Sequence, residues 1–311
     1  MKQKGREKWK MSEAAFAIAS SPTRSTQDFP PDATIVNCCP KKASMPLPHQ
    51  SSFPIADAHL HLPAASPEAL GAWRKAGLRR GLAAAATTEE WPGLLELAAA
   101  SGGMLRVALG IHPWHLPQDL DTAMESLEAI IEQDGGHHIA AIGEIGLDRR
   151  HAGVPAEDIQ YEWLRRQCGI AVRRSLPVVL HICGAWDGLL RLFREFPGLR
   201  GILHGFSGNA VQAGELLRKS HLSLSFGARL LRPGAALLQA AAAVPLPRLL
   251  VESDAPNGGA TPLLCGDLVA LLAHIRGERP DDISSAICGN WEQLFSGRQS
   301  FAPRSPRSLP S

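Results

Sequence analysis

Six side chains that commonly bind divalent metals end successive apolar stretches of this chain. Four are histidines and two are carboxylates, and each follows residues typical of a buried β-strand. The carboxyl ends of parallel strands meet at one edge of a sheet, so side chains at these positions converge. The pattern therefore predicts a site for two divalent cations, built from His59, His61, Glu144, His181, His204 and Asp254.

The first of these stretches carries two of the histidines. Alternate side chains of a strand share a face, so Asp57, His59 and His61 are expected to point the same way. Two imidazoles at this spacing bind one cation through their ring nitrogens. We expect Asp57 to orient one of the two histidines without binding the cation itself. A loop with two exposed histidines is the alternative for this motif alone.

Glu144 lies among apolar residues and glycines at the end of a strand-like run. A buried carboxylate is costly unless it is paired or binds a metal. Its two oxygens allow it to bridge two cations, whereas a salt bridge to Arg149 is the alternative. His181 and His204 end two consecutive apolar runs, and together they are expected to supply a second metal site.

Asp254 ends the last apolar run, and closure of a barrel would bring it next to the first strand. On its own, an aspartate before Ala-Pro also fits a turn. His112 is expected to contact substrate, and Asp148 to support a ligand histidine. Arginines expected to meet an anion are Arg149, Arg150 and Arg229. A solvated surface role is the alternative for each of these weaker candidates.

Strands and helices alternate along the part of the chain that carries these residues. Strands are expected at 54–60, 81–87, 105–111, 139–145, 177–182, 201–205, 222–226 and 248–252. Helices are expected at 66–78, 121–133, 157–174, 209–219, 262–275 and 282–295. The alternation predicts an α/β fold, a (β/α)8 TIM-type barrel in a single domain. An open doubly wound sheet is the rival, but no Gly-rich phosphate loop follows the first strand.

The chain ends differ in composition from this central part. The whole chain has 311 residues, 45% of them apolar, which is enough for one large core. Residues 1–52 are rich in Ser, Pro and Lys and lack sustained periodicity. We expect them, and residues 297–311, to be disordered tails around a domain at 53–296. The net charge of +2 does not by itself indicate a nucleic-acid-binding protein.

Cysteine spacing and hydropathy bear on the location of the protein. The six cysteines show no zinc-ribbon or disulfide spacing and are expected to be reduced thiols. We find no apolar stretch typical of a secretory signal and none long enough to span a membrane. We therefore expect a cytoplasmic protein with no membrane partner and no obligate protein partner.

Six motifs, in this order, resemble those of the TatD family of metal-dependent hydrolases in the amidohydrolase superfamily. The resemblance covers about residues 55–295. It implies a (β/α)8-type barrel, two divalent ions (Mg, Mn or Zn) and, most often, deoxyribonuclease activity at 3′ ends. It also assigns His59, His61 and Asp254 to one metal, His181 and His204 to the other, and Glu144 to both. The motifs are DAHLH (57–61), GIHP (110–113), AIGEIGLD (141–148), PVVLH (177–181), LHGFSG (203–208) and ESDAP (252–256).

The chain also departs from the family pattern. Cys183 stands where the family often has an arginine, two residues after the fifth-strand histidine. Residues 257–261 contain no arginine, and His-Gly-Phe replaces His-Cys-Phe at 204–206. The departures leave the metal ligands intact but remove positive charge that would meet a phosphate. They weaken the prediction of a nucleic acid substrate more than the prediction of hydrolysis.

The ligand set and the resemblance together predict a metal-dependent hydrolase that cleaves phosphodiester bonds in nucleic acid, single-stranded or at 3′ ends. Two cations about 3.5–4 Å apart would share and activate a water. Asp254 is expected to be the general base, and Glu144 the bridging catalytic carboxylate. One alternative is an amide or ester hydrolase on the same barrel, such as one acting on an aminoacyl ester of RNA. The other is a non-catalytic relative that binds metal or nucleic acid.

Overall fold

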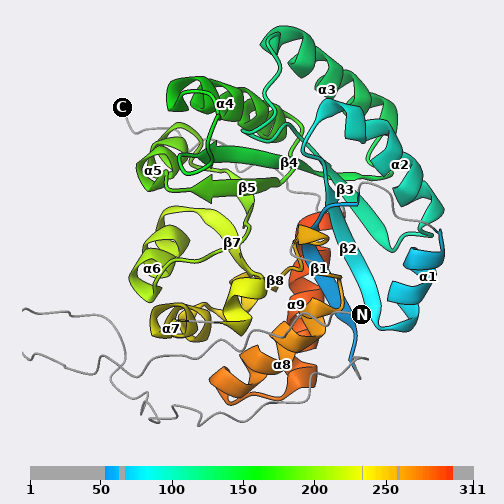
Figure 1. Cartoon of the computed structure of the whole chain (residues 1–311), viewed down its shortest axis with the longest axis vertical. Coiled ribbons are helices and arrows are strands. Elements are labelled where there is room, and N and C mark those ends of the chain that lie inside the picture. The colour runs from blue at the N-terminus through cyan, green and yellow to red at the C-terminus, as the bar shows by residue number, and fades with distance from the viewer. Residues whose placement is uncertain (1–52, 63–66, 233, 258–259, 297–311) are drawn as a thin grey trace, which may run out of the picture. The chain divides into compact units, whose positions relative to one another are not determined.

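Apolar runs of three to ten residues form eight parallel strands, each hydrogen-bonded to the next in sequence order (Figure 1). This computed structural model describes residues 53–62, 67–232, 234–257 and 260–296. The predicted disordered tails, 1–52 and 297–311, lie outside the described residues. The strands are β1 (Ile55–Leu60), β2 (Leu78–Ala84), β3 (Leu105–Leu109), β4 (Ile139–Asp148), β5 (Val178–Cys183), β6 (Arg200–Leu203), β7 (His221–Phe226) and β8 (Leu249–Val251).

Helices follow the strands and surround them (Figure 1). Residues of β1 and β4 are buried throughout, because helices cover one side of the sheet and its own curvature encloses the other. None of the helices in the described part of the chain has the length and hydropathy needed to cross a lipid bilayer. The helices are α1 (Pro67–Lys75), α2 (Trp91–Ala100), α3 (Leu120–Asp134), α4 (Glu157–Arg173), α5 (Trp186–Glu195), α6 (Ala210–Lys219), α7 (Ala235–Ala243), α8 (Leu264–Arg276) and α9 (Pro280–Phe295).

The first and last strands meet at a seam that nearly closes the sheet into a ring. The backbone N–H of Asp254 donates to the carbonyl of His59 at 3.0 Å, and the N–H of His61 donates to the carbonyl of Ala255 at 2.7 Å. From α9, the indole N–H of Trp291 donates to the carbonyl of Asp57 at 3.1 Å. The predicted (β/α)8 TIM-type barrel is therefore confirmed.

Several elements differ from their predicted bounds. β2 begins three residues earlier than predicted and ends at Ala84, because the chain turns at Thr87 into a short 3-10 helix, Thr88–Glu90. No helix is predicted at the positions of α2, α5 and α7. The sequences of α2 and α7 are dominated by Ala, Leu and other apolar residues with few polar positions, so neither shows a clear polar face. α5 is amphipathic, but Ala185 at its N-cap gives no capping side chain to mark its start.

Gly201 in β6 allows a close approach between strands that no other residue would permit. Its φ is 146°, and a Cβ placed on it would lie 2.0 Å from the carbonyl oxygen of Val178 in β5. By contrast, a Cβ on Gly289 in α9 would have no neighbour within 4 Å.

We therefore expect Gly201→Ala to lower the free energy of unfolding by about 1–3 kcal/mol, because the backbone must leave its present conformation. Gly289→Ala is the matched control and should raise it by about 0.5–1 kcal/mol through helix propensity. Urea unfolding followed by circular dichroism measures both. Equal stability of wild type and Gly201→Ala would contradict the close approach.

Candidate metal centre

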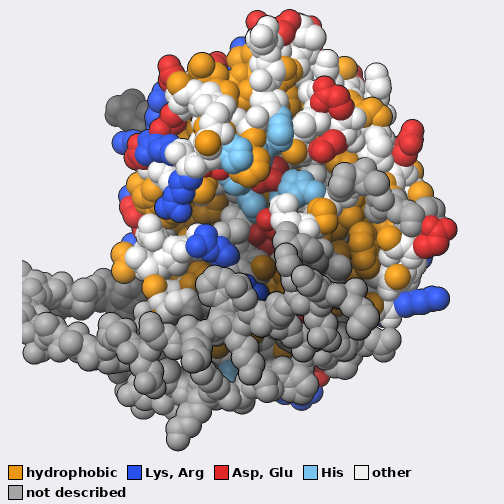
Figure 2. Space-filling view, viewed as in Figure 1, with side chains coloured by type: hydrophobic (Ala, Val, Ile, Leu, Met, Phe, Trp, Pro, Cys, Tyr) orange, Lys and Arg blue, Asp and Glu red, His pale blue; other side chains and the backbone are white. Residues whose placement is uncertain are grey.

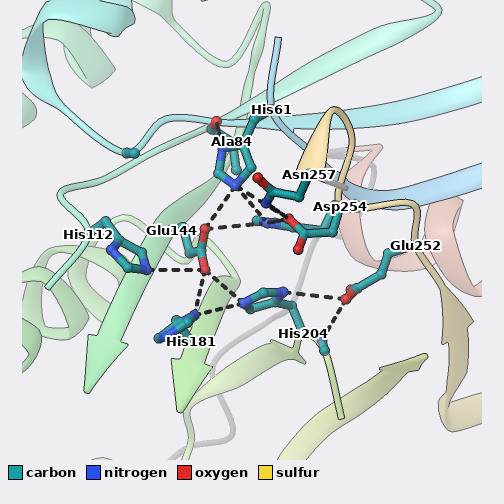
Figure 3. A network of polar contacts seen from close by, with 12 residues as sticks. His61, Ala84, His112, Glu144, His181, His204, Glu252, Asp254 and Asn257 are labelled. Atoms are coloured by element: carbon teal, nitrogen blue, oxygen red, sulfur yellow. Dashed lines mark hydrogen bonds and ion pairs between the residues drawn. The ribbon is translucent and has the colours of Figure 1, made fainter. Parts of the chain in front are cut away.

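Histidine and acidic side chains gather in a hollow on one face of the barrel, with Lys and Arg side chains to one side (Figure 2). At the centre of this cluster is the carboxylate of Glu144, which is only 2% exposed (Figure 3). Glu144 lies within β4 between Gly143 and Gly146. A Cβ on Gly146 would fall 1.8 Å from the carbonyl oxygen of His181. Glycine is therefore required for β4 and β5 to bring Glu144 and His181 together.

One oxygen of Glu144 faces the two histidines at the end of β1. Its Oε2 lies 3.3 Å from His59 Nε2 and 3.1 Å from His61 Nε2. These two nitrogens are 3.2 Å apart. Asp254, which follows β8, brings its Oδ1 to 3.6 Å from His59 Nε2 and 3.7 Å from His61 Nε2. Closure at the seam therefore brings together four side chains that can bind a metal ion, and they come from three distant segments.

The other oxygen of Glu144 faces a second group of histidines (Figure 3). Its Oε1 lies 2.7 Å from His204 Nε2, 3.0 Å from His181 Nδ1 and 3.5 Å from His112 Nε2. His181 belongs to β5, while His204 and His112 follow β6 and β3. His181 Nδ1 and His204 Nε2 are 3.1 Å apart. Each oxygen of one carboxylate therefore has its own set of ring nitrogens.

The outer nitrogens of three histidines face oxygen atoms, and for His61 and His181 the contact is a hydrogen bond that sets which nitrogen of the neutral ring carries the proton. His61 Nδ1 lies 3.0 Å from the carbonyl oxygen of Ala84. His181 Nε2 lies 3.1 Å from Asp148 Oδ2, and His204 Nδ1 lies 3.4 Å from Glu252 Oε1. When His61 or His181 is neutral and donates outward, the lone pair of its other ring nitrogen is directed inward, toward Glu144. Lone pairs that converge on a carboxylate need a cation between them, so this donor set fits divalent metal ions.

His112 differs from these histidines in its hydrogen bonding. The backbone N–H of Trp114 donates to His112 Nδ1 at 3.2 Å, so the proton of the neutral ring is on Nε2, which faces Glu144. Burial lowers the pKa of His112 to about 4, so the ring is neutral at pH 7. His112 therefore donates to Glu144. Its predicted contact with substrate is not visible in this arrangement and stays a prediction.

The charges within the cluster depend on one another. Burial alone would raise the pKa of Glu144, but His204 and His59 outweigh it and hold that pKa well below its usual range. Burial opposes ionisation of His204, but the carboxylates of Glu144 and Glu252 raise its pKa well above the ordinary value. Burial lowers the pKa of His59. Without metal the cluster therefore retains protons, which a metal ion must displace.

The two predicted supporting carboxylates have different partners. Asp148 contacts His181, as described above, and its other oxygen accepts the backbone N–H groups of Arg150 and His151 at 2.7 and 3.0 Å. Asp57 was expected to orient a ligand ring. Instead its oxygens accept the backbone N–H of His59 at 3.2 Å and the hydroxyl of Ser253 at 2.6 Å. Asp57 therefore supports the backbone at the seam.

A cleft of about 700 Å³ opens beside the cluster, and its lining includes His181, His204 and Asp254. Arg150 and Arg229 also line it, and both are exposed. Arg149 is not part of the lining. Two of its guanidinium nitrogens donate to Asp187 and Glu157, at 2.7 and 2.6 Å. The predicted contact of Arg149 with substrate therefore has no support from its position.

Sequence reasoning missed the roles of two residues near the cluster. Glu252, the first residue of the ESDAP motif, contacts His204 and accepts the N–H of Gly205 at 2.6 Å. The sequence assigns no role to Trp114, whereas in the structure its indole N–H donates to Asp148 Oδ2 at 2.9 Å. The available signal for Trp114 was its place between two histidines in the segment after β3.

Comparison with known proteins agrees with this geometry. The family model "TatD related DNase" matches residues 56–296. An Escherichia coli K12 protein named uncharacterized metal-dependent hydrolase YjjV is 32% identical over 235 residues, covering 71% of this chain and 88% of that protein. A Citrobacter rodentium protein named 3′-5′ ssDNA/RNA exonuclease TatD is 28% identical over 205 residues, covering 60% of this chain and 75% of that protein.

The fold comparison leads to the same group of proteins. The crystal structure of YjjV, a TatD homologue from E. coli K12, superposes with a TM-score of 0.69 at 28% identity. The superposition covers 78% of this chain and 98% of that one. The chain belongs to the TatD family of metal-dependent hydrolases.

Proposed function

We propose that this protein is a nuclease that cleaves phosphodiester bonds in single-stranded nucleic acid with the help of two divalent metal ions. One observation carries the proposal. The two oxygens of the buried Glu144 carboxylate face separate sets of ring nitrogens, His59 and His61 on one side and His181 and His204 on the other. A carboxylate that bridges two cations requires such an arrangement.

The residues divide naturally between the two ions. His59, His61 and Asp254 would hold one ion with Oε2 of Glu144, and His181 and His204 would hold the other with Oε1. When bound, the pair lowers the pKa of a shared water and neutralises charge on the phosphoryl oxygens. The mixed imidazole and carboxylate donors suit zinc or manganese better than magnesium.

Asp254 is the residue proposed to take the proton of the attacking water. Its side chain is 36% exposed, whereas that of Glu144 is almost fully buried, so Asp254 reaches both the cluster and the cleft. Its φ of 52° lies in the left-handed region, which turns the chain at this point. Asn257 Nδ2 donates to Asp254 Oδ1 at 2.9 Å and holds the carboxylate in place.

The positions of two arginines are evidence for an anionic substrate. Arg150 and Arg229 line the same cleft as the proposed ligands, and no ion pair of either is found among the described residues. A Cβ on Gly184, the residue after Cys183, would lie 3.4 Å from Nε of Arg150. Arg150 therefore places positive charge close to the position where the family often has an arginine. The name of the C. rodentium relative supports single-stranded nucleic acid as the substrate.

We expect the purified protein to shorten 3′-labelled single-stranded DNA in the presence of Mn²⁺, and EDTA to stop the reaction. Asp254→Asn should lower kcat by about 100- to 10,000-fold, because it removes the general base. Asp281→Asn, an exposed aspartate in the first turn of α9, is the matched control and should leave kcat unchanged. A gel assay with circular dichroism of each variant measures activity and folding.

Two results would contradict this proposal. The first is full activity of a folded, metal-loaded Asp254→Asn protein. The second is hydrolysis of nitrophenyl esters by the wild type without cleavage of DNA or RNA, which would favour the ester hydrolase alternative.

The bridging role of Glu144 has a separate test that does not depend on activity. We expect Glu144→Gln to lower the bound metal from two ions per chain to one or none, because a neutral amide offers a single weak donor oxygen. Added Mn²⁺ should also raise the melting temperature of the wild type much more than that of the variant. Elemental analysis after dialysis and thermal melting measure these quantities. Glu215→Gln on α6 is the control. Two tightly bound ions in Glu144→Gln would exclude the bridge.

A further inference from the structure

Trp114 presents a large aromatic ring at the mouth of the barrel, next to the candidate metal centre. The residue is 41% exposed. Single exposed apolar residues are common on protein surfaces, so exposure alone assigns no role. The contacts of the ring are more informative, because they determine how the indole is oriented.

The indole is held by residues that also contact the cluster around Glu144. Its N–H donates to Asp148 Oδ2 at 2.9 Å, the oxygen that also faces His181. Its ring meets that of His112 edge to face, with centroids 4.7 Å apart, and its centroid is 5.9 Å from that of His181. The ring is therefore fixed beside the histidines that face Oε1 of Glu144.

A second exposed ring lies flat against Trp114. The imidazole of His151 stacks on the indole, with centroids 3.9 Å apart and planes 19° from parallel. His151 belongs to the segment after β4, which Asp148 Oδ1 holds through the backbone N–H groups of Arg150 and His151. One oxygen of Asp148 thus fixes the indole and the other fixes the segment that carries the imidazole. Both rings lie outside the hydrophobic core, so packing of the barrel does not explain the stack.

We propose that Trp114 and His151 form a stacking platform for a nucleobase of the substrate. This inference rests on the proposed nuclease function and names how that site recognises nucleic acid. Every nucleobase has a flat face that stacks on an aromatic ring, whatever the sequence. Arg150, next to His151 in the sequence, lines the cleft beside the cluster and offers a cation for a phosphate of the same substrate. The platform selects unpaired bases, because a duplex keeps both faces of each base within its own stack.

A reaction product, AMP, and an analogue that lacks the base, ribose 5-phosphate, provide a test that does not depend on hydrolysis. AMP and ribose 5-phosphate carry the same phosphate and differ by the base. We expect the metal-loaded wild type to bind AMP on the order of tenfold more tightly than ribose 5-phosphate, as measured by isothermal titration calorimetry. Trp114→Ala should reduce that ratio to near one without weakening ribose 5-phosphate, and His151→Ala should reduce it in part.

Two further variants separate stacking from the hydrogen bond to Asp148. Trp114→Phe keeps an aromatic ring but loses the indole N–H, so it should retain most of the preference for AMP. Val172→Ala, an exposed position on α4, should match the wild type. Circular dichroism and metal content check that each variant is folded and loaded.

The possible outcomes distinguish the platform from the proposed function. The platform is excluded if the wild type binds both ligands equally, or if it fails to bind AMP at millimolar concentration. It is also excluded if Trp114→Ala weakens both ligands to the same extent, because the indole would then act only through Asp148. A base-dependent preference in a protein that cleaves no DNA or RNA would instead overturn the nuclease proposal and leave the platform standing.

Discussion

A buried carboxylate that must be balanced by positive charge dominates this structure. Glu144 is almost completely removed from water, and an isolated ionised carboxylate there would be strongly destabilising. The fold offsets this cost because histidines from β1, from β5 and from the ends of β3 and β6 contact the two carboxylate oxygens of Glu144. Charge shared with imidazoles keeps the carboxylate ionised, and metal ions are suited to take over that task. The strand order, the glycines of β4 and the supporting carboxylates all serve this arrangement.

The sequence predicted the barrel and the residues that meet at its centre, because both depend on local patterns. Strands that end in a polar residue after an apolar run are visible without knowledge of their neighbours, and parallel order brings those ends together. The partners of a long, flexible side chain cannot be predicted from such local patterns. Arg149 and Arg150 are adjacent in the sequence, yet one is held by Glu157 and Asp187 while the other lines the cleft.

Roles that depend on hydrogen-bond direction were also beyond sequence reasoning. His112 and His181 both face Oε1 of Glu144, but a backbone N–H makes one of them a donor, and Asp148 leaves the other with its lone pair inward. No spacing rule distinguishes the two cases. Similarly, α2 and α7 were missed because their Ala- and Leu-rich sequences show no alternation of polar and apolar faces. The stack of Trp114 on His151 joins two segments that only the fold makes neighbours.

The seam between β1 and β8 makes the candidate site depend on a late step of folding. His59 and His61 belong to the first described strand, whereas Asp254 follows the last one, and backbone hydrogen bonds join these ends directly. Contacts between such distant parts of a chain are slow to form, because closing the long loop between them costs conformational entropy before any contact energy is gained. The proposed ligands on the two sides of the seam therefore come together only when the strands at both ends of the barrel are in place. A chain that ends before β8 would lack Asp254 and the seam, and therefore one side of the proposed metal centre.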